Sequence, residues 1–120
     1  MQHLLVTGGS GFIGSNFVRH ILGKYSDYFV INLDTLTYAG NPDNLGDVDA
    51  DTRYRFVHGD ICDPKIVEPL MEEANALVHF AAESHVDRSI MGGAEFVQTD
   101  VYGTYVLLES AKNHGVEKFH

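Results

Sequence analysis

The chain has 120 residues, 44% of them hydrophobic, with 17 acidic and 8 basic side chains and a formal net charge of −9. This length and apolar content suit one globular domain with its own core rather than a disordered segment. Because nucleic-acid binding depends on neutralising phosphates with Lys and Arg, the acidic balance argues against a nucleic-acid partner. No apolar run approaches the roughly 20 residues of a membrane span, so no membrane partner is expected.

The cysteine and histidine content gives further expectations. Cys62 is the only cysteine in the sequence, which excludes an internal disulfide and favours a reducing, cytoplasmic location. The 7 histidines show no ligand spacing. His58 and His79 fall in or at the end of predicted strands, where a structural role is favoured over a metal site. We therefore expect no metal.

Apolar runs alternate with helical patterns along the chain. Strands are predicted at 3–7, 28–33, 54–58 and 76–81, and a fifth begins near 116. A first helix is predicted at 12–23. A second begins after an N-cap at Asp63 and is expected to kink or break at Pro69. A third is predicted at about 93–113, with Gly115 as its stop. This alternation predicts the α/β class with a parallel sheet covered by helices on both faces.

One segment does not fit the alternation. Residues 34–52 show no clear periodicity and are longer than most loops between a strand and a helix. Loops of this length are usually functional or disordered, and the residues at the start of this one favour function.

A glycine pattern joins the first strand to the first helix. The stretch VTGGSGFIG places Gly8, Gly11 and Gly14 three residues apart. A tight turn, close approach of a pyrophosphate and close helix–strand packing each need a residue without a Cβ. The N–H groups and partial positive charge of the helix N-terminus then suit phosphates without any lysine. The alternative is that the glycines serve the turn alone.

Asp34 supports the binding alternative. It closes the second strand twenty residues after Gly14, where the ribose-binding carboxylate of dinucleotide folds is found. A carboxylate there accepts hydrogen bonds from ribose hydroxyls and repels a 2′-phosphate. The position therefore favours NAD over NADP as the cofactor.

Three longer motifs carry a family resemblance. TGGSGFIG resembles the fingerprint of the extended short-chain dehydrogenase/reductase family, although its glycine spacing differs from that of most dehydrogenases. LDTLTYAGN, GDICD and FAAESHVDRSI resemble the dTDP-glucose 4,6-dehydratases within that family. The resemblance covers nearly the whole chain but only the N-terminal third of the family. It implies that 1–120 is the N-terminal part of an NAD-binding Rossmann domain, with the rest of the sheet and the substrate domain outside this chain. The implied fold is a Rossmann-like doubly wound parallel sheet in the order 3-2-1-4-5, truncated in its fifth strand.

The resemblance also implies a set of site residues. Phe12 and Ile13 would lie over the pyrophosphate, Asp60 and Ile61 beside the adenine, and Ser84 between cofactor and hexose. The implied cofactor set is Gly8, Gly11, Phe12, Ile13, Gly14, Asp34, Thr35, Leu36, Thr37, Gly40, Asp60, Ile61, Phe80, Ala81, Ala82, Ser84 and Thr99, and the implied substrate contacts are Ser84 and Arg88. Two alternatives stay open, because Asp60 can instead cap a turn and Arg88 can instead form a structural ion pair. Asp100 departs from the asparagine usual after the threonine.

The implied function is a nucleotide-sugar 4,6-dehydratase that converts dTDP-glucose by internal hydride transfer and loss of water. The family's Tyr-x-x-x-Lys motif and Asp-Glu pair are absent from these residues, so no catalytic residue is expected in this chain. The alternatives are another extended family member acting on nucleotide sugars, such as an epimerase or decarboxylase, and a non-catalytic NAD-binding module. A homodimer is expected through the helix at 93–113. Its sheet-facing residues would include Val97, Val101, Leu108 and Ala111, and its partner-facing residues Phe96, Tyr102, Tyr105 and Val106.

Overall fold

A single parallel sheet organises the chain in the computed structural model, which describes residues 1–35, 45–81 and 98–120. Its strands are β1 (Gln2–Thr7), β2 (Tyr28–Asp34), β3 (Tyr54–His58), β4 (Ala76–His79) and β5 (Lys118–Phe119). They lie in the order β3-β2-β1-β4-β5, and every neighbouring pair is parallel. The predicted fold class and strand order are confirmed.

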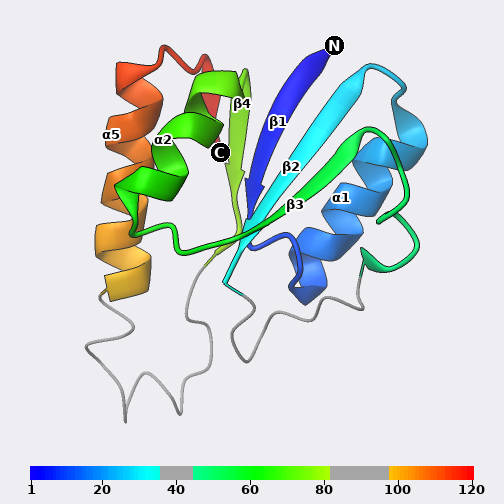
Figure 1. The fold of residues 1–120 in the computed structure, drawn as a ribbon, viewed down its shortest axis with the longest axis horizontal. Helices are drawn as coiled ribbons and strands as arrows, with labels where there is room; N and C mark the ends of the chain where they lie inside the picture. The colour runs from blue at the N-terminus through cyan, green and yellow to red at the C-terminus, as the bar shows by residue number, and fades with distance from the viewer. Residues whose placement is uncertain (36–44, 82–97) are drawn as a thin grey trace, which may run out of the picture.

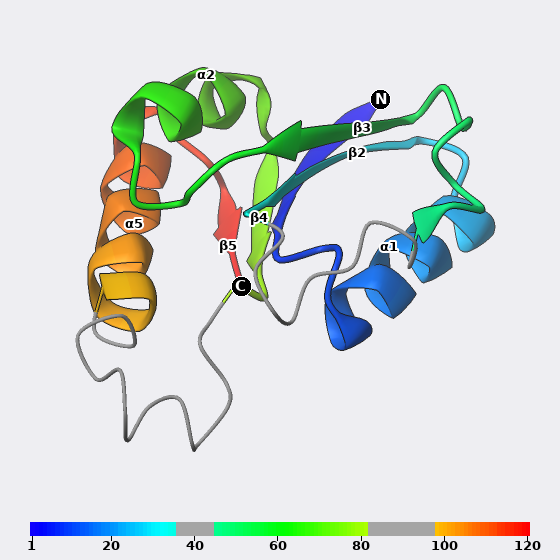
Figure 2. The same cartoon turned by 60° about the horizontal axis from the view of Figure 1, so that its bottom comes forward.

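Helices cover both faces of the sheet (Figures 1 and 2). The helix α1 (Phe12–Lys24) lies on one face, and α2 (Pro64–Glu73) and α5 (Thr104–Asn113) lie together on the other. A π-helical segment, η2 (Gln98–Gly103), leads directly into α5. No helix among the residues described is long and apolar enough to cross a membrane.

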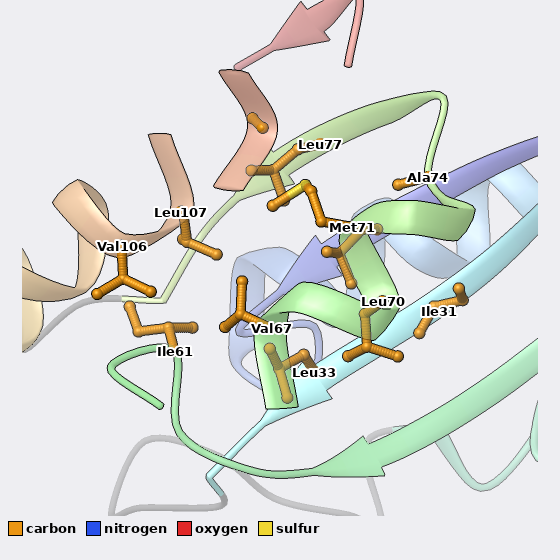
Figure 3. Close-up of a cluster of buried hydrophobic side chains, with 12 residues drawn as sticks. Ile31, Leu33, Ile61, Val67, Leu70, Met71, Ala74, Leu77, Val106 and Leu107 are labelled. Carbon is orange, nitrogen blue, oxygen red and sulfur yellow. The ribbon is translucent and has the colours of Figure 1, made fainter. Parts of the chain in front are cut away.

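The core divides into two layers because successive residues of a strand point to opposite faces. On β1, Leu4 and Val6 pack toward α1, while Leu5 packs toward α2 and α5. Figure 3 shows the second layer, in which Met71 and Leu107 from the two helices meet Leu77 and Leu33 of the sheet. A strand buried on both faces must be apolar at nearly every position, which explains the continuous apolar run in β1.

Part of the long segment after β2 is structural. Leu45 is 1% exposed and Val48 is 9% exposed, and both pack into the α1 layer of the core. Arg19 of α1 forms an ion pair of 2.7 Å with Asp47 between them. Leu45 and Val48 therefore give 45–50 a structural role. The functional expectation rests on the residues at the start of the segment and stays a prediction.

One predicted strand end and one predicted helix break need correction. The strand β4 ends at His79 rather than at Ala81. Pro69 does not break α2, which continues from Pro64 to Glu73. The proline removes one intrahelical hydrogen bond, but Val67, Leu70 and Met71 bury the same helix in the core. The Asp63 N-cap is confirmed, since its carboxylate accepts from the Lys65 N–H at 3.0 Å.

The buried face of the last helix also differs from the prediction. Val106 and Leu107 are buried with Ala111, whereas Val101 is 64% exposed and Leu108 is 48% exposed. The π-helical segment η2 has more residues per turn than an α-helix, so a 3.6-residue period extended through it assigns its residues to the wrong face.

The stop at Gly115 is confirmed. Its φ is +68°, and its N–H donates to the Lys112 carbonyl at 3.4 Å while the Val116 N–H donates to the Ala111 carbonyl at 3.0 Å. This pair of bonds is the Schellman arrangement, in which glycine relieves the strain of a left-handed conformation.

A contact between α2 and α5 gives a pH prediction. The hydrogen bond from His114 Nε2 lowers the pKa of the Glu68 carboxyl. A depressed pKa in the folded state stabilises the protein above the ordinary glutamate value of about 4.5, and this stabilisation is lost as the pH falls through the folded value. Thermal melting of the full gene product should show Glu68→Gln melting below the parent at neutral pH. The two melting temperatures should converge as the pH falls through the folded-state pKa of Glu68. A difference that stays constant over that fall would contradict this linkage.

Candidate functional site

The glycine loop turns sharply because neighbouring backbone leaves no room for side chains. Gly8 follows β1 with a φ of +71°, and a Cβ there would lie 2.7 Å from the backbone nitrogen of Ala81, which follows β4. A Cβ on Gly14 would lie 2.3 Å from the Gly8 carbonyl oxygen. The structural roles predicted for a turn glycine and a helix-packing glycine are confirmed at these two positions.

Two side chains of β2 hold the loop in place. Asn32, which is fully buried, accepts from the Gly9 N–H through Oδ1 at 2.9 Å. Asp34, which is 8% exposed, accepts from the Ser10 N–H through Oδ2 at 2.9 Å. The conformation of the loop is thus set by the adjacent strand before any ligand arrives.

Asn32 uses its remaining donors within the same network. Its Nδ2 donates to Ser10 Oγ at 3.1 Å and to Tyr54 Oη at 3.1 Å. Burial raises the pKa of the Tyr54 hydroxyl, with the Asn32 hydrogen bond opposing, so Tyr54 stays neutral. Sequence reasoning missed Asn32, Ser10 and Tyr54. The available signal was a lone amide within the otherwise apolar β2, since a buried amide needs partners.

The first turn of α1 begins directly after the glycine loop. Gly11 is the N-cap and has no side chain with which to cap the turn, and the turn holds no acidic residue. Phe12 is 80% exposed and Ile13 is 67% exposed, although both are large and apolar. First-turn N–H groups have no partner within the helix, so the arrangement suits an anion that binds the backbone beneath two apolar side chains.

The other predicted residues that the structure describes lie after the carboxyl ends of the strands, which meet at one edge of a parallel sheet. Thr35 follows β2, and its carbonyl lies 3.0 Å from His58 Nε2 at the end of β3. Phe80 and Ala81 follow β4, and the Phe80 ring lies 5.3 Å from that of Phe17. These residues are therefore close to the glycine loop.

Asp60 and Ile61 have structural roles in the turn after β3. The Asp60 carboxylate accepts from the Cys62 N–H at 2.9 Å, which is the turn-capping alternative considered from the sequence. Ile61 is 4% exposed and lies in the core beside Val106 (Figure 3). Its contact with a ligand ring stays a prediction.

Several predicted site residues lie outside the described residues. These are Leu36, Thr37, Gly40, Ala82, Ser84, Arg88 and the side chain of Thr99. Within the described parts of the chain, no group of His, Cys, Asp and Glu side chains could hold a metal ion. The rings of His58 and His79 make hydrogen bonds instead, as expected for structural histidines.

The strand order, the glycine loop after β1 and the acid closing β2 together define a Rossmann-like chain of the dinucleotide-binding type. The model of the family described as GDP-mannose 4,6 dehydratase matches residues 5–120. The chain belongs to this family.

Individual relatives agree with that assignment. The chain is 54% identical over 116 residues to a dTDP-glucose 4,6-dehydratase of Haemophilus influenzae, covering 95% of this chain and 34% of that protein. The structure of DesIV, a dTDP-glucose 4,6-dehydratase from Streptomyces venezuelae solved with NAD bound, matches with a TM-score of 0.93 and 54% identity over 98% of this chain and 38% of that one. A UDP-glucose 4-epimerase from Thermotoga maritima matches with a TM-score of 0.87 and 32% identity over 98% of this chain and 36% of that one. The chain spans about a third of the length of the curated relatives it matches.

The close contact at Gly8 gives a prediction with a matched control. Gly8→Ala in the full gene product should lower stability by at least about 1–2 kcal/mol, the cost of the left-handed conformation alone, and should displace Ala81 as well. Gly23→Ala is the control, because no atom lies within 4 Å of its Cβ position. It should be neutral or stabilising by up to about 1 kcal/mol. Equal unfolding free energies for the two variants in urea would contradict the geometry described for the loop.

Proposed function

We propose that this chain is the NAD-binding portion of a nucleotide-sugar 4,6-dehydratase that converts dTDP-glucose to dTDP-4-keto-6-deoxyglucose. The observation that carries the proposal is the glycine loop, fixed by Asn32 and Asp34 of β2 against the first turn of α1. The identity of 54% to a dTDP-glucose 4,6-dehydratase supports the same activity.

The described residues offer groups that suit the pyrophosphate and the adenosine ribose of NAD. The first-turn N–H groups of α1 would bind the pyrophosphate, with Phe12 and Ile13 lying over it. Asp34 closes β2 beside the loop and would accept hydrogen bonds from the adenosine ribose. Ala81 presents only a methyl group after β4, so a flat ring can approach the backbone there. Bound NAD would take up a hydride from the hexose and return it later in the same reaction.

The remaining site assignments extend this proposal to residues outside the described parts. Leu36, Thr37 and Gly40 would enclose the adenosine end, and Ala82 and Thr99 the nicotinamide end. Ser84 would contact both cofactor and hexose, and Arg88 the diphosphate of the sugar nucleotide. The protons of the reaction would be moved by residues outside this sequence, which holds no Tyr-x-x-x-Lys motif.

A second candidate is an epimerase acting on a nucleotide sugar, and the UDP-glucose 4-epimerase fold match favours it. That match is 32% identical, against 54% for the DesIV dehydratase, over almost the same share of the chain. The dehydratase is therefore the better-supported proposal. A cytoplasmic location is part of it, on the evidence of the lone cysteine.

The test is to incubate the full gene product with dTDP-glucose and follow formation of the 4-keto-6-deoxy product. We expect turnover that needs NAD. Interconversion of hexose epimers without loss of water would favour the second candidate, and NAD binding without turnover of any nucleotide sugar would favour a non-catalytic module.

Asp34 variants probe the cofactor assignment in the same protein. Asp34→Ala should weaken NAD binding by about 1–3 kcal/mol, because the ribose hydroxyls and the Ser10 N–H both lose a charged acceptor. Asp34→Asn keeps an acceptor for the Ser10 N–H, so it should bind NAD better than Asp34→Ala while discriminating less against NADP. Calorimetry that finds parental NAD affinity in both variants would remove Asp34 from the site.

A homodimer is the expected assembly, and the outer face of η2 and α5 supports it. Val101, Tyr102, Tyr105 and Leu108 form an exposed apolar stripe, between 44% and 64% exposed. Such a contiguous stripe is typical of a surface that another protein covers. Of the predicted partner-facing residues, Tyr102 and Tyr105 are exposed, Val106 is buried, and Phe96 lies outside the described residues. Val101 and Leu108, which were predicted to face the sheet, are exposed instead.

Analytical sedimentation should show whether the protein is a dimer or a monomer. We expect the full gene product to be a dimer at micromolar concentration and Tyr105→Glu to shift it to monomer, because a charge would be buried in the interface. His20→Glu, on the exposed face of α1, is the control and should stay dimeric. A monomeric parent protein would show the assignment of the stripe to be wrong.

A further inference from the structure

A series of side-chain hydrogen bonds crosses from β1 through β4 to the start of α5. Thr7 and His79 are register partners on β1 and β4, and Thr7 Oγ1 lies 2.6 Å from His79 Nδ1. His79 Nε2 lies 3.0 Å from Thr104 Oγ1. Thr104 Oγ1 in turn donates to the carbonyl of Asp100 in η2 at 2.8 Å. The series joins segments that are far apart in the sequence.

The series has one direction, because each hydroxyl carries a single proton. The Thr104 hydroxyl donates its proton to the Asp100 carbonyl, which can only accept. Thr104 Oγ1 must therefore accept a hydrogen bond from His79 Nε2–H. In the neutral ring Nδ1 then carries no proton and accepts a hydrogen bond from the Thr7 hydroxyl. Thr7 Oγ1 also accepts from the Ala81 N–H at 3.4 Å. The contacts therefore select the neutral Nε2-protonated tautomer of His79.

The ends of this series adjoin the segments assigned to the cofactor. Thr7 directly precedes Gly8, whose position is fixed against the Ala81 backbone. His79 directly precedes Phe80 and Ala81. Asp100 directly follows Thr99. A change in the ring would thus act on the glycine loop, the end of β4 and the start of η2 together.

We propose that His79 is a positioning residue: its neutral ring holds these three segments in the arrangement that receives a dinucleotide, and protonation of the ring loosens them. The inference rests on the proposed NAD binding. A proton on Nδ1 would face the hydroxyl of Thr7, and that hydroxyl's own proton would lose its acceptor although Thr7 is fully buried.

The surroundings of the ring fit this role. Burial lowers the pKa of His79, and the charge of Asp100 opposes that effect. The other elements packed on the ring contribute the Thr7 hydroxyl from β1, the Thr104 hydroxyl from α5 and the Phe119 ring of β5, whose centroid lies 6.4 Å away. Because the folded-state pKa is lowered, the neutral form and its stabilisation are complete above the ordinary histidine range and are lost as the pH falls below it.

The first test is an NMR titration of the full gene product labelled at histidine. We expect the Nε2-protonated tautomer at neutral pH and a His79 titration midpoint below the ordinary value of about 6.5. Asp100→Asn should move the midpoint lower still, because it removes the charge that favours the protonated ring. An Nδ1-protonated tautomer, or a midpoint that Asp100→Asn leaves in place or raises, would overturn the proposal.

The second test measures NAD affinity at about pH 8 and at about one pH unit below the His79 midpoint found in the titration. The parent and the control His20→Gln should bind NAD more weakly at the lower pH. His79→Leu should raise the dissociation constant about tenfold at the higher pH and should lose the pH dependence. His79→Asn can still accept from Thr7, so it should recover part of the affinity.

The outcomes separate this proposal from the one it rests on. A parent protein that does not bind NAD at the higher pH would refute the proposed function, and the NMR titration would then judge the His79 series by itself. Folded His79 variants with parental affinity at both pH values would refute the positioning role alone. If those variants do not fold, the effect of Asp100→Asn on the midpoint decides.

Discussion

The arrangement depends on β1 being hydrogen-bonded on both edges and buried on both faces. It pairs with β2 over the full length of the strand and with β4 from Leu4 to Thr7. A strand in this position cannot shift its register without moving its apolar residues out of both layers of the core. The ends of β2 and β4 are therefore fixed on either side of the residue where β1 stops, and the loop that follows β1 is bounded by both.

Each neighbour fixes the loop in a different way. From β2, Asn32 and Asp34 supply the acceptors for the N–H groups of Gly9 and Ser10. From β4, the Ala81 backbone comes so close to Gly8 that no side chain fits between them. One neighbour thus acts through hydrogen bonds and the other through exclusion. A loop defined on both sides loses little entropy when a ligand binds, which is the physical benefit of preorganisation.

Sequence reasoning recovered those features that arise from local periodicity or from turn chemistry. The parallel sheet followed from the alternation of apolar runs and helical patterns, and Gly115 and Asp63 were identified from the backbone conformations that helix ends require. The errors arose where a distant contact decides the outcome. Leu45 and Val48 are buried only because the sheet and α1 leave a space for them, and Pro69 is tolerated because the core holds α2. The role of Asn32 likewise depends on its hydrogen bond with the Gly9 N–H, which is distant in the sequence and which no local pattern shows.

The acidic composition and a site for an anionic ligand are compatible because of where the charges lie. The formal net charge is −9, yet the first turn of α1 holds no acid and offers N–H groups under the positive end of the helix dipole. Asp34 is the acid nearest the loop, and its Oδ2 accepts from the Ser10 N–H on the β2 side. That bond spreads part of the carboxylate charge into the backbone of the loop. The glycine loop separates Asp34 from the first turn of α1. It hydrogen-bonds to Asp34 through the Ser10 N–H and leaves the first-turn N–H groups of the helix for a pyrophosphate. An acid at the proposed ribose position is therefore compatible with a pyrophosphate at the helix.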